Sequence, residues 1–153
     1  MTQGTPSGVS GLIYDLHATY EVAGFKAKAL YTATMVNDAD KIAADNANAA
    51  SISDADGYYV NVEYDLLATV GTTYRLPLFA QYDHINPNGT VVDATNTDIS
   101  SSANSAESDT TTVGVNFFPH EQVVLKIDYA TTVYVQDNTP DDKTLSLGLG
   151  FIF

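Results

Sequence analysis

The chain has 153 residues, of which 44% are hydrophobic, yet no stretch approaches the roughly 20 consecutive apolar residues that a membrane helix requires. Six lysines and arginines stand against 19 aspartates and glutamates, and this formal net charge of -13 with no basic stripe excludes nucleic acid as a partner. The absence of cysteine excludes disulfides and thiolate metal sites, and we expect no cofactor.

Residues 1–10 do not have the pattern of a strand, because Gly4, Pro6 and Gly8 interrupt them. They also lack the charged n-region and the apolar h-region of a secretory signal. An exported protein needs such a signal, so for an exported protein we expect that the signal lies upstream of this chain or has been removed.

Seven β-strands are predicted from residues that alternate between apolar and polar and are bounded by turn signals. Most of them approach the length of about 9–11 residues with which a tilted strand crosses a bilayer. They lie at about 11–22, 25–35, 57–67, 74–84, 111–118, 122–134 and 143–153.

The predicted connections alternate between short and long, as they do in bacterial outer-membrane barrels. Short turns lie at 23–24, 68–73 and 119–121, and long outer loops lie near 36–56, 85–110 and 135–142. In the first long loop, residues 40–50 have a composition that allows a short helix. The predicted fold is therefore all-β, an antiparallel up-and-down transmembrane β-barrel segment that occupies residues 1–153 as a single domain.

One face of every predicted strand is apolar in a consistent register, and the opposite face carries the charges. A basic side chain at the lipid-facing midplane costs roughly 2–4 kcal/mol, so a barrel keeps its charges on the inside. We expect no charge on the lipid-facing side, and of the aromatic residues only Tyr59, Phe79, Phe118 and Tyr134 to face inward. The predicted pore-lining residues are Asp15, His17, Glu21, Lys26, Lys28, Glu63, Asp65, Arg75, Gln81, Asp83, Lys126 and Asp128.

The first predicted hairpin provides an internal check of this register. A two-residue turn at 23–24 sets Val22 opposite Phe25, so that two apolar residues meet. The same turn sets Glu21 opposite Lys26 on the pore-lining face. This predicts a cross-strand ion pair worth about 0.2–1 kcal/mol.

The last eleven residues alternate apolar with small or polar side chains and end on a phenylalanine. This ending resembles the C-terminal signal that is read by the barrel assembly machinery of Gram-negative bacteria. The residues that carry the resemblance are Leu149, Phe151 and Phe153. It implies that the assembly machinery and the outer-membrane lipid are partners of this chain.

A more specific family resemblance is carried by the stretches 57–67, 76–86, 112–120 and 123–129. They resemble the closing strands of outer-membrane porins related to the phosphate-selective O and P type, over roughly residues 11–153. The resemblance implies a barrel of about sixteen strands, often a homotrimer, that passes small hydrophilic solutes passively. Seven strands are an odd number, so this chain is expected to be the C-terminal part of such a barrel. Gln81 stands where this group often has a basic residue, so anion selectivity is not implied.

The predicted outer loops are strongly acidic and contain Lys41 as their single basic residue. Their acidic residues are Asp38, Asp40, Asp45, Asp54, Asp56, Asp93, Asp98, Glu107, Asp109, Asp137, Asp141 and Asp142. A negative mouth raises the local cation concentration and repels anions, and divalent ions can bridge it to lipopolysaccharide. This predicts cation preference, although acidic loops also occur simply because they keep a surface soluble.

Other candidate sites have simpler interpretations. Asp15 and His17 share a face, but no serine nucleophile is evident beside them, which favours a pair on the pore wall over an acid/base pair. The stretch 54–57 resembles the opening of a calcium loop, but its later ligands are missing, and a turn before the third strand suffices. Lys126 and Asp128 either contact permeating solutes or form solvated salt bridges to a neighbouring strand.

Two other functional classes explain the same alternation. One is a small, non-conducting structural or adhesive outer-membrane barrel with a plugged interior. The other is a soluble β-sandwich binding module, in which the apolar face packs on a second sheet and the charged face meets water. The sequence leaves open the transported solute, the total strand number and the oligomeric state.

Overall fold

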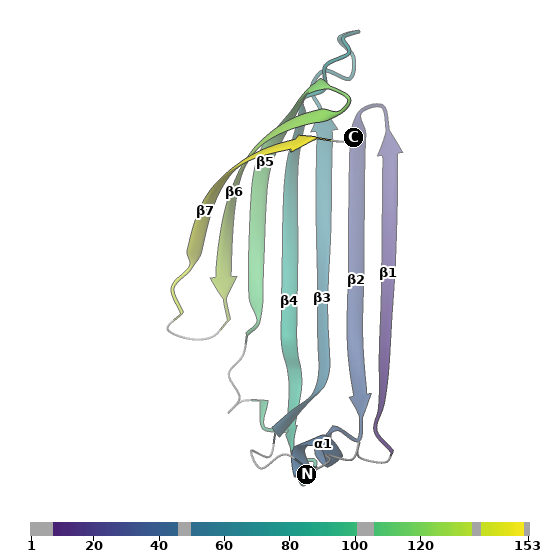
Figure 1. Ribbon diagram of the computed structural model, residues 1–153, viewed down its shortest axis with the longest axis vertical. Coiled ribbons are helices and arrows are strands. Elements are labelled where there is room, and N and C mark those ends of the chain that lie inside the picture. The colour runs from purple at the N-terminus through teal and green to yellow at the C-terminus, as the bar shows by residue number, and fades with distance from the viewer. Residues whose placement is uncertain (1–7, 46–49, 101–105, 136–138, 152–153) are drawn as a thin grey trace.

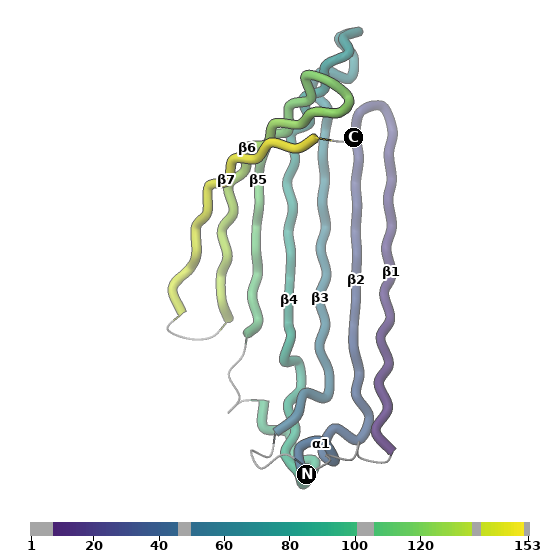
Figure 2. Tube along the Cα trace, in the orientation of Figure 1, coloured from purple at the N-terminus to yellow at the C-terminus, as the bar shows by residue number. Residues whose placement is uncertain are grey.

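A computed structural model describes residues 8–45, 50–100, 106–135 and 139–151. One sheet contains seven strands, β1 (Ser10–Val22), β2 (Phe25–Asn37), β3 (Ala50–Asp65), β4 (Pro77–Asp93), β5 (Ser108–His120), β6 (Val123–Tyr134) and β7 (Asp142–Phe151). Each strand pairs antiparallel with the next, which confirms the predicted up-and-down topology. The sheet is curved and open, with β1 and β7 at its two edges (Figure 1, Figure 2).

The turn between β1 and β2 has the predicted two-residue form. Ala23 and Gly24 both adopt positive φ angles, 48° and 83°, as the turn type that matches strand twist requires. For Ala23 this left-handed backbone costs about 1–2 kcal/mol. At Gly24 a Cβ would also collide with the side chain of Ala68, so both the positive φ and the lack of space favour glycine at this position. Val22 lies opposite Phe25, and Glu21 lies opposite Lys26, as predicted.

β3 and β4 are longer than predicted, because part of each expected long loop continues the sheet. β3 begins at Ala50 rather than 57, and β4 runs to Asp93 rather than 84. The register shifts between residues 52 and 56, opposite Gly89, where a Cβ would collide with the side chain of Asp54. The extension was not predicted because acidic and turn-forming residues usually indicate a loop. In the structure the bulges accommodate these residues within paired strands.

The long-loop end of the sheet also carries the helix α1 (Ala39–Asp45), which packs against β3 and β4 (Figure 1). The helix predicted at 40–50 is present over Ala39–Asp45, Ala50 belongs to β3, and residues 46–49 lie outside the described part of the chain. Ala39 and Ala43 are buried on this helix, and Val91 and Val92 are buried on β4. None of the helices in the described ranges is long and apolar enough to cross a bilayer.

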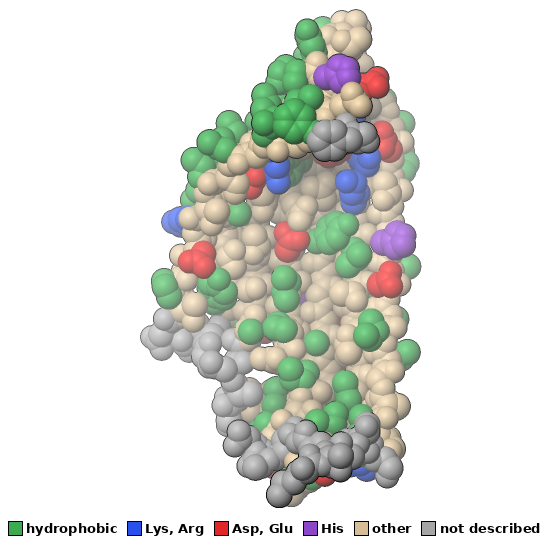
Figure 3. Space-filling model, in the orientation of Figure 1, with side chains coloured by type: hydrophobic (Ala, Val, Ile, Leu, Met, Phe, Trp, Pro, Cys, Tyr) green, Lys and Arg blue, Asp and Glu red, His purple; other side chains and the backbone are tan. Residues whose placement is uncertain are grey.

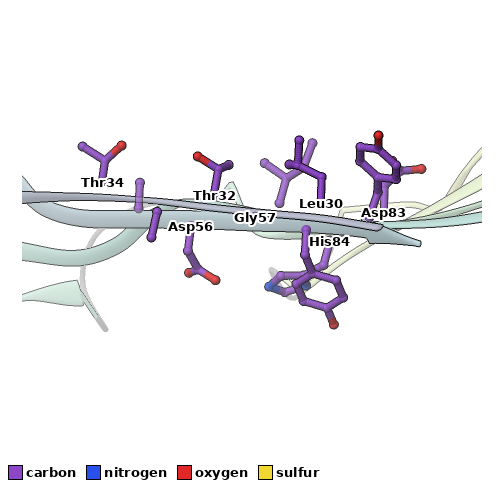
Figure 4. Close-up of a pocket in the computed structure, with 12 residues that line it drawn as sticks. Leu30, Thr32, Thr34, Asp56, Gly57, Asp83 and His84 are labelled. Carbon is purple, nitrogen blue, oxygen red and sulfur yellow. The ribbon is translucent and has the colours of Figure 1, made fainter. Parts of the chain in front are cut away.

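The strand register separates the sheet into two faces that keep their character from β1 to β7. We call them the apolar face, which includes Leu16, Tyr58 and Leu147, and the polar face, which includes Lys28 and Asp83. Figure 4 shows the division edge-on, with Leu30, Thr32, Thr34 and Asp83 on one side of the sheet and Asp56 and His84 on the other.

The apolar face is uncovered. Leu16 and Leu147 are 72% and 76% exposed, and most other large apolar side chains of this face are exposed as well. Within the described ranges the buried apolar side chains are few: Ala33, Ala39, Ala43, Pro77, Phe79, Val91 and Val92. A continuous exposed apolar surface of this kind marks contact with lipid or another protein rather than with water.

At the long-loop end, the apolar face does carry charged and titratable groups, so the expectation of none there was wrong. Asp54 and Asp56 lie opposite Met35 and Ala33, and Asp109 lies opposite His84. The strands simply continue past their predicted ends and keep the same alternation. Their neighbours are tyrosines: the ring of Tyr58 stacks on His84 at 5.0 Å and lies 6.0 Å from Tyr82. A further pair, Tyr14 and Tyr31, has ring centroids 6.2 Å apart.

Candidate channel wall

All twelve predicted pore-lining residues lie on the polar face. The register connects them from β1 to β7, and the bridge between Arg75 and Phe118 places Arg75 with them. Figure 3 shows one face of the sheet, over which acidic, basic and histidine side chains are scattered among uncharged ones. Placement on one face is what a channel wall requires, and whether this face lines a pore stays a prediction.

Most charged groups of the polar face are paired. Lys26 Nζ lies 3.0 Å from Glu21 Oε2, which confirms the predicted cross-strand ion pair. Lys126 Nζ lies 3.3 Å from Asp128 Oδ2 on its own strand, rather than reaching a neighbouring strand. These are partly exposed pairs, so each contributes about 0–1 kcal/mol to stability. Their larger effect is to neutralise the wall locally.

Asp65 organises the short-turn end of the polar face. Its Oδ1 accepts backbone N–H groups from Leu67 at 3.0 Å and Leu76 at 2.9 Å, and its Oδ2 accepts Arg75 Nε at 3.4 Å. The guanidinium of Arg75 lies 5.0 Å from the ring centroid of Phe118. These contacts tie the ends of β3, β4 and β5 together, which gives Asp65 and Arg75 a structural role.

Phe79 packs on Gly114 in the middle of the polar face. A Cβ at Gly114 would lie 2.7 Å from a ring carbon of Phe79 and 2.6 Å from the carbonyl oxygen of Ile127. The ring is 8% exposed, and Lys126 Nζ lies 5.2 Å from its centroid. An aromatic ring laid over a strand glycine fills the space that the glycine leaves and pins the register of the two strands.

A chain of side-chain hydrogen bonds crosses β3 and β4 beside this ring. Asn61 donates through Nδ2 to Gln81 Oε1 at 3.2 Å, and Gln81 donates through Nε2 to both oxygens of Asp83, at 2.8 and 3.0 Å. Because a carboxylate only accepts, Asp83 fixes the direction of both amides. The carbonyl oxygen of Asn61 is left buried and without a hydrogen-bond partner in the described part of the chain.

The comparison with protein families decides what this wall belongs to. Residues 4–153 match the family described as phosphate-selective porin O and P. The chain belongs to this porin family. The resemblance predicted from the closing strands is thus confirmed, and it extends over nearly the whole chain. Searches of the curated proteins and of the solved structures found no match.

As a member of a porin family, the protein is a channel-forming protein of the bacterial outer membrane. The open sheet fits part of the wall of a transmembrane barrel, with the apolar face toward lipid. Leu149 and Phe151 lie on that face of β7. Phe153 is outside the described residues, so the role of the three in assembly stays a prediction.

Two of the other candidate sites have a definite place in the porin. Asp15 and His17 lie 3.6 Å apart on the edge strand β1, and their side chains are 63% and 75% exposed. Asp54 and Asp56 lie within β3, not in a turn before it. No group of three or more histidine, aspartate or glutamate side chains that could hold a metal ion occurs in the described ranges.

Sequence reasoning missed two features of the wall. Gln81 was predicted to line the pore, but its bond to Asn61 depends on the register of β3 with β4 across the connection at 66–76. Phe79 was predicted to face inward, but its partner Gly114 follows a long connection whose length does not fix the register. A glycine inside a predicted strand was the one available signal for close packing at 114.

Proposed function

We propose that this porin forms a water-filled channel for the passive diffusion of small hydrophilic solutes and ions, with the polar face as its inner wall. One observation carries the proposal. From β1 to β7 the register places the predicted pore-lining residues on one face, while the opposite face exposes large apolar side chains and carries charged groups at its long-loop end. A bilayer imposes this separation on a barrel that encloses water.

Cation preference follows from the charges that this chain contributes. The polar face has the basic residues Lys26, Lys28, Arg75 and Lys126 against the acidic residues Asp15, Glu21, Glu63, Asp65, Asp83 and Asp128. The connections at the long-loop end are acidic as well. Such a field concentrates cations at the entrance and repels anions. We therefore do not extend phosphate selectivity from the family description to this chain.

Closure of the channel needs more strands than the described sheet contains. β1 and β7 run in the same direction, because β2 to β6 lie between them and each strand is antiparallel to the next. In lipid, unpaired backbone groups along these edges cost several kcal/mol each, so both edges must be paired. An odd number of further strands between β7 and β1 completes an antiparallel wall. We propose lipid and lipopolysaccharide, and further copies in a homotrimer, as the neighbours of the apolar face.

The test is conductance of the complete native polypeptide in planar bilayers. Stepwise, ohmic current is expected, and in a KCl gradient the reversal potential should have the sign for K⁺ over Cl⁻. A preference for chloride would contradict the proposed cation preference but would still agree with the proposed diffusion channel. Insertion without any conductance would favour the structural or adhesive barrel. A monodisperse monomer that is soluble without detergent would favour the β-sandwich.

A further inference from the structure

One basic residue of the polar face stands apart from the other three. Lys26 is paired with Glu21 at 3.0 Å, Arg75 with Asp65 at 3.4 Å, and Lys126 with Asp128 at 3.3 Å. Lys28 forms no ion pair with any residue that the structure describes. It is the fourth residue of β2, and its ammonium group is the one unpaired strand cation on the polar face of the described residues.

Asn61 lies directly opposite Lys28 in the register of β2 and β3. Its side chain is more than nine-tenths buried, and its amide group is oriented by the chain through Gln81 to Asp83. This orientation leaves the Asn61 carbonyl oxygen without a donor among the described residues. That oxygen is buried beneath its neighbours and out of reach of a solute, so Asn61 is a fixed, uncharged residue that neither binds a solute nor neutralises Lys28.

Glu63 completes the arrangement on the next polar-face position of β3. It lies opposite Lys26, but the ammonium group of Lys26 is held by Glu21. Glu63 forms no ion pair with a described residue, and it does not pair with Lys28, its diagonal neighbour. Directly opposite Cβ atoms lie about 4.5–5.5 Å apart and diagonal neighbours about 7–8 Å, within reach of one small solute.

We propose that Lys28 and Glu63 form a solute subsite on the channel wall for small zwitterions, namely amino acids and short peptides. The solute carboxylate binds the ammonium of Lys28, and the solute ammonium binds the carboxylate of Glu63. Asn61 lies beside both residues and stays bound to Gln81. The inference rests on the proposed channel function and names one class of solute for it.

The charge pattern selects against singly charged solutes. A monocarboxylate is attracted to Lys28 but repelled by Glu63. A monoamine is attracted to Glu63 but repelled by Lys28. Since Lys28 and Glu63 are not held by other side chains, both can move toward a solute and release it again. Weak, reversible binding is what a diffusion channel requires of a wall site.

The test uses the complete native polypeptide in planar bilayers, with glycine added to a fixed KCl concentration. Glycine carries no net charge at neutral pH, so it reduces the ionic current by occupying the channel. The current should fall saturably with glycine, and an equal concentration of acetamide should cause no saturating fall. In Lys28→Gln and in Glu63→Gln the half-saturating glycine concentration should rise at least about tenfold.

Lys126→Gln is the matched control, because it removes a polar-face lysine that is already paired. It should leave the half-saturating glycine concentration unchanged, and Lys28→Arg, which keeps the charge, should retain saturation. Conducting channels without glycine saturation, an equal effect of Lys126→Gln, or saturation by acetate at the same concentration would each overturn the subsite. Absence of channels in the unaltered protein would instead contradict the proposed function, and the subsite with it.

Discussion

His84 and Asp109 face each other across β4 and β5 on the apolar face, with His84 Nδ1 2.8 Å from Asp109 Oδ1. The hydroxyl of Tyr82 donates to the same oxygen at 2.7 Å. On the next strand, Val133 lies opposite Asp109. On the face that we propose contacts lipid, a hydrogen-bonded cluster of tyrosine, histidine and aspartate is expected at the level where the hydrocarbon ends and the head groups begin.

This boundary predicts a depth dependence for added charge on β6. Ile127→Arg places a charge in the middle of the apolar face and should lower the free energy of unfolding by about 2–4 kcal/mol. Val133→Arg, opposite Asp109, should cost about 0–1 kcal/mol, because it lies at the boundary. Urea unfolding in lipid vesicles measures both values. Equal costs at the two positions would contradict the placement of Ile127 in hydrocarbon and of Val133 at the head groups.

The packing of Phe79 on Gly114 predicts that Gly114→Ala is destabilising. The added Cβ would crowd the Phe79 ring, the Ile127 carbonyl and the Asp128 side chain, so we expect a loss of about 1–3 kcal/mol in the free energy of unfolding. Gly148→Ala is the control, because its Cβ would meet Lys126 Cβ at an ordinary 3.6 Å. If the two substitutions have equal effects in the same unfolding assay, Gly114 is not a packing requirement.

The turn after β4 predicts a local response to acid. The hydroxyl of Thr95 and the backbone N–H groups of Thr97 and Thr95 bind the carboxylate of Asp93 and lower its pKa below the ordinary 3.8. A carboxyl whose folded pKa is lowered stabilises the turn above its unfolded pKa. That stabilisation is lost as the pH falls through the lower, folded value.

Amide NMR of Thr97 measures this response. The Thr97 signal should remain unchanged at neutral pH and shift with a midpoint below 3.8. Asp93→Asn, which keeps an acceptor oxygen but does not titrate, should remove the shift. A midpoint at or above 3.8 in the unaltered protein would contradict the hydrogen bonding described for Asp93.

The part of the fold that sequence predicted well is the part governed by period-two alternation. Glu21 and Lys26 were placed opposite each other because a two-residue turn leaves no freedom of register. The faces of all seven strands followed from the same rule. Alternation is local, so it needs no knowledge of which strands are neighbours.

The features that sequence did not predict depend on register between strands joined by longer connections. The extension of β3 and β4 contains Asp54, Asp56 and Gly89, residue types that normally mark loops, and becomes visible only once the bulged pairing is known. The Asn61 to Gln81 bond and the Phe79 to Gly114 contact are cross-strand pairs of the same kind. Single-strand patterns carry no information about such partners.

Cysteine accessibility during conductance recording tests most directly whether the polar face lines the channel. The chain has no cysteine, so Ser146→Cys and Leu147→Cys place one thiol each on adjacent residues of opposite faces of β7. A charged, water-soluble thiol reagent should reduce the single-channel current of Ser146→Cys and leave that of Leu147→Cys unchanged. Modification of Leu147→Cys with a fall in current, while Ser146→Cys is unaffected, would reverse the two faces and contradict the account.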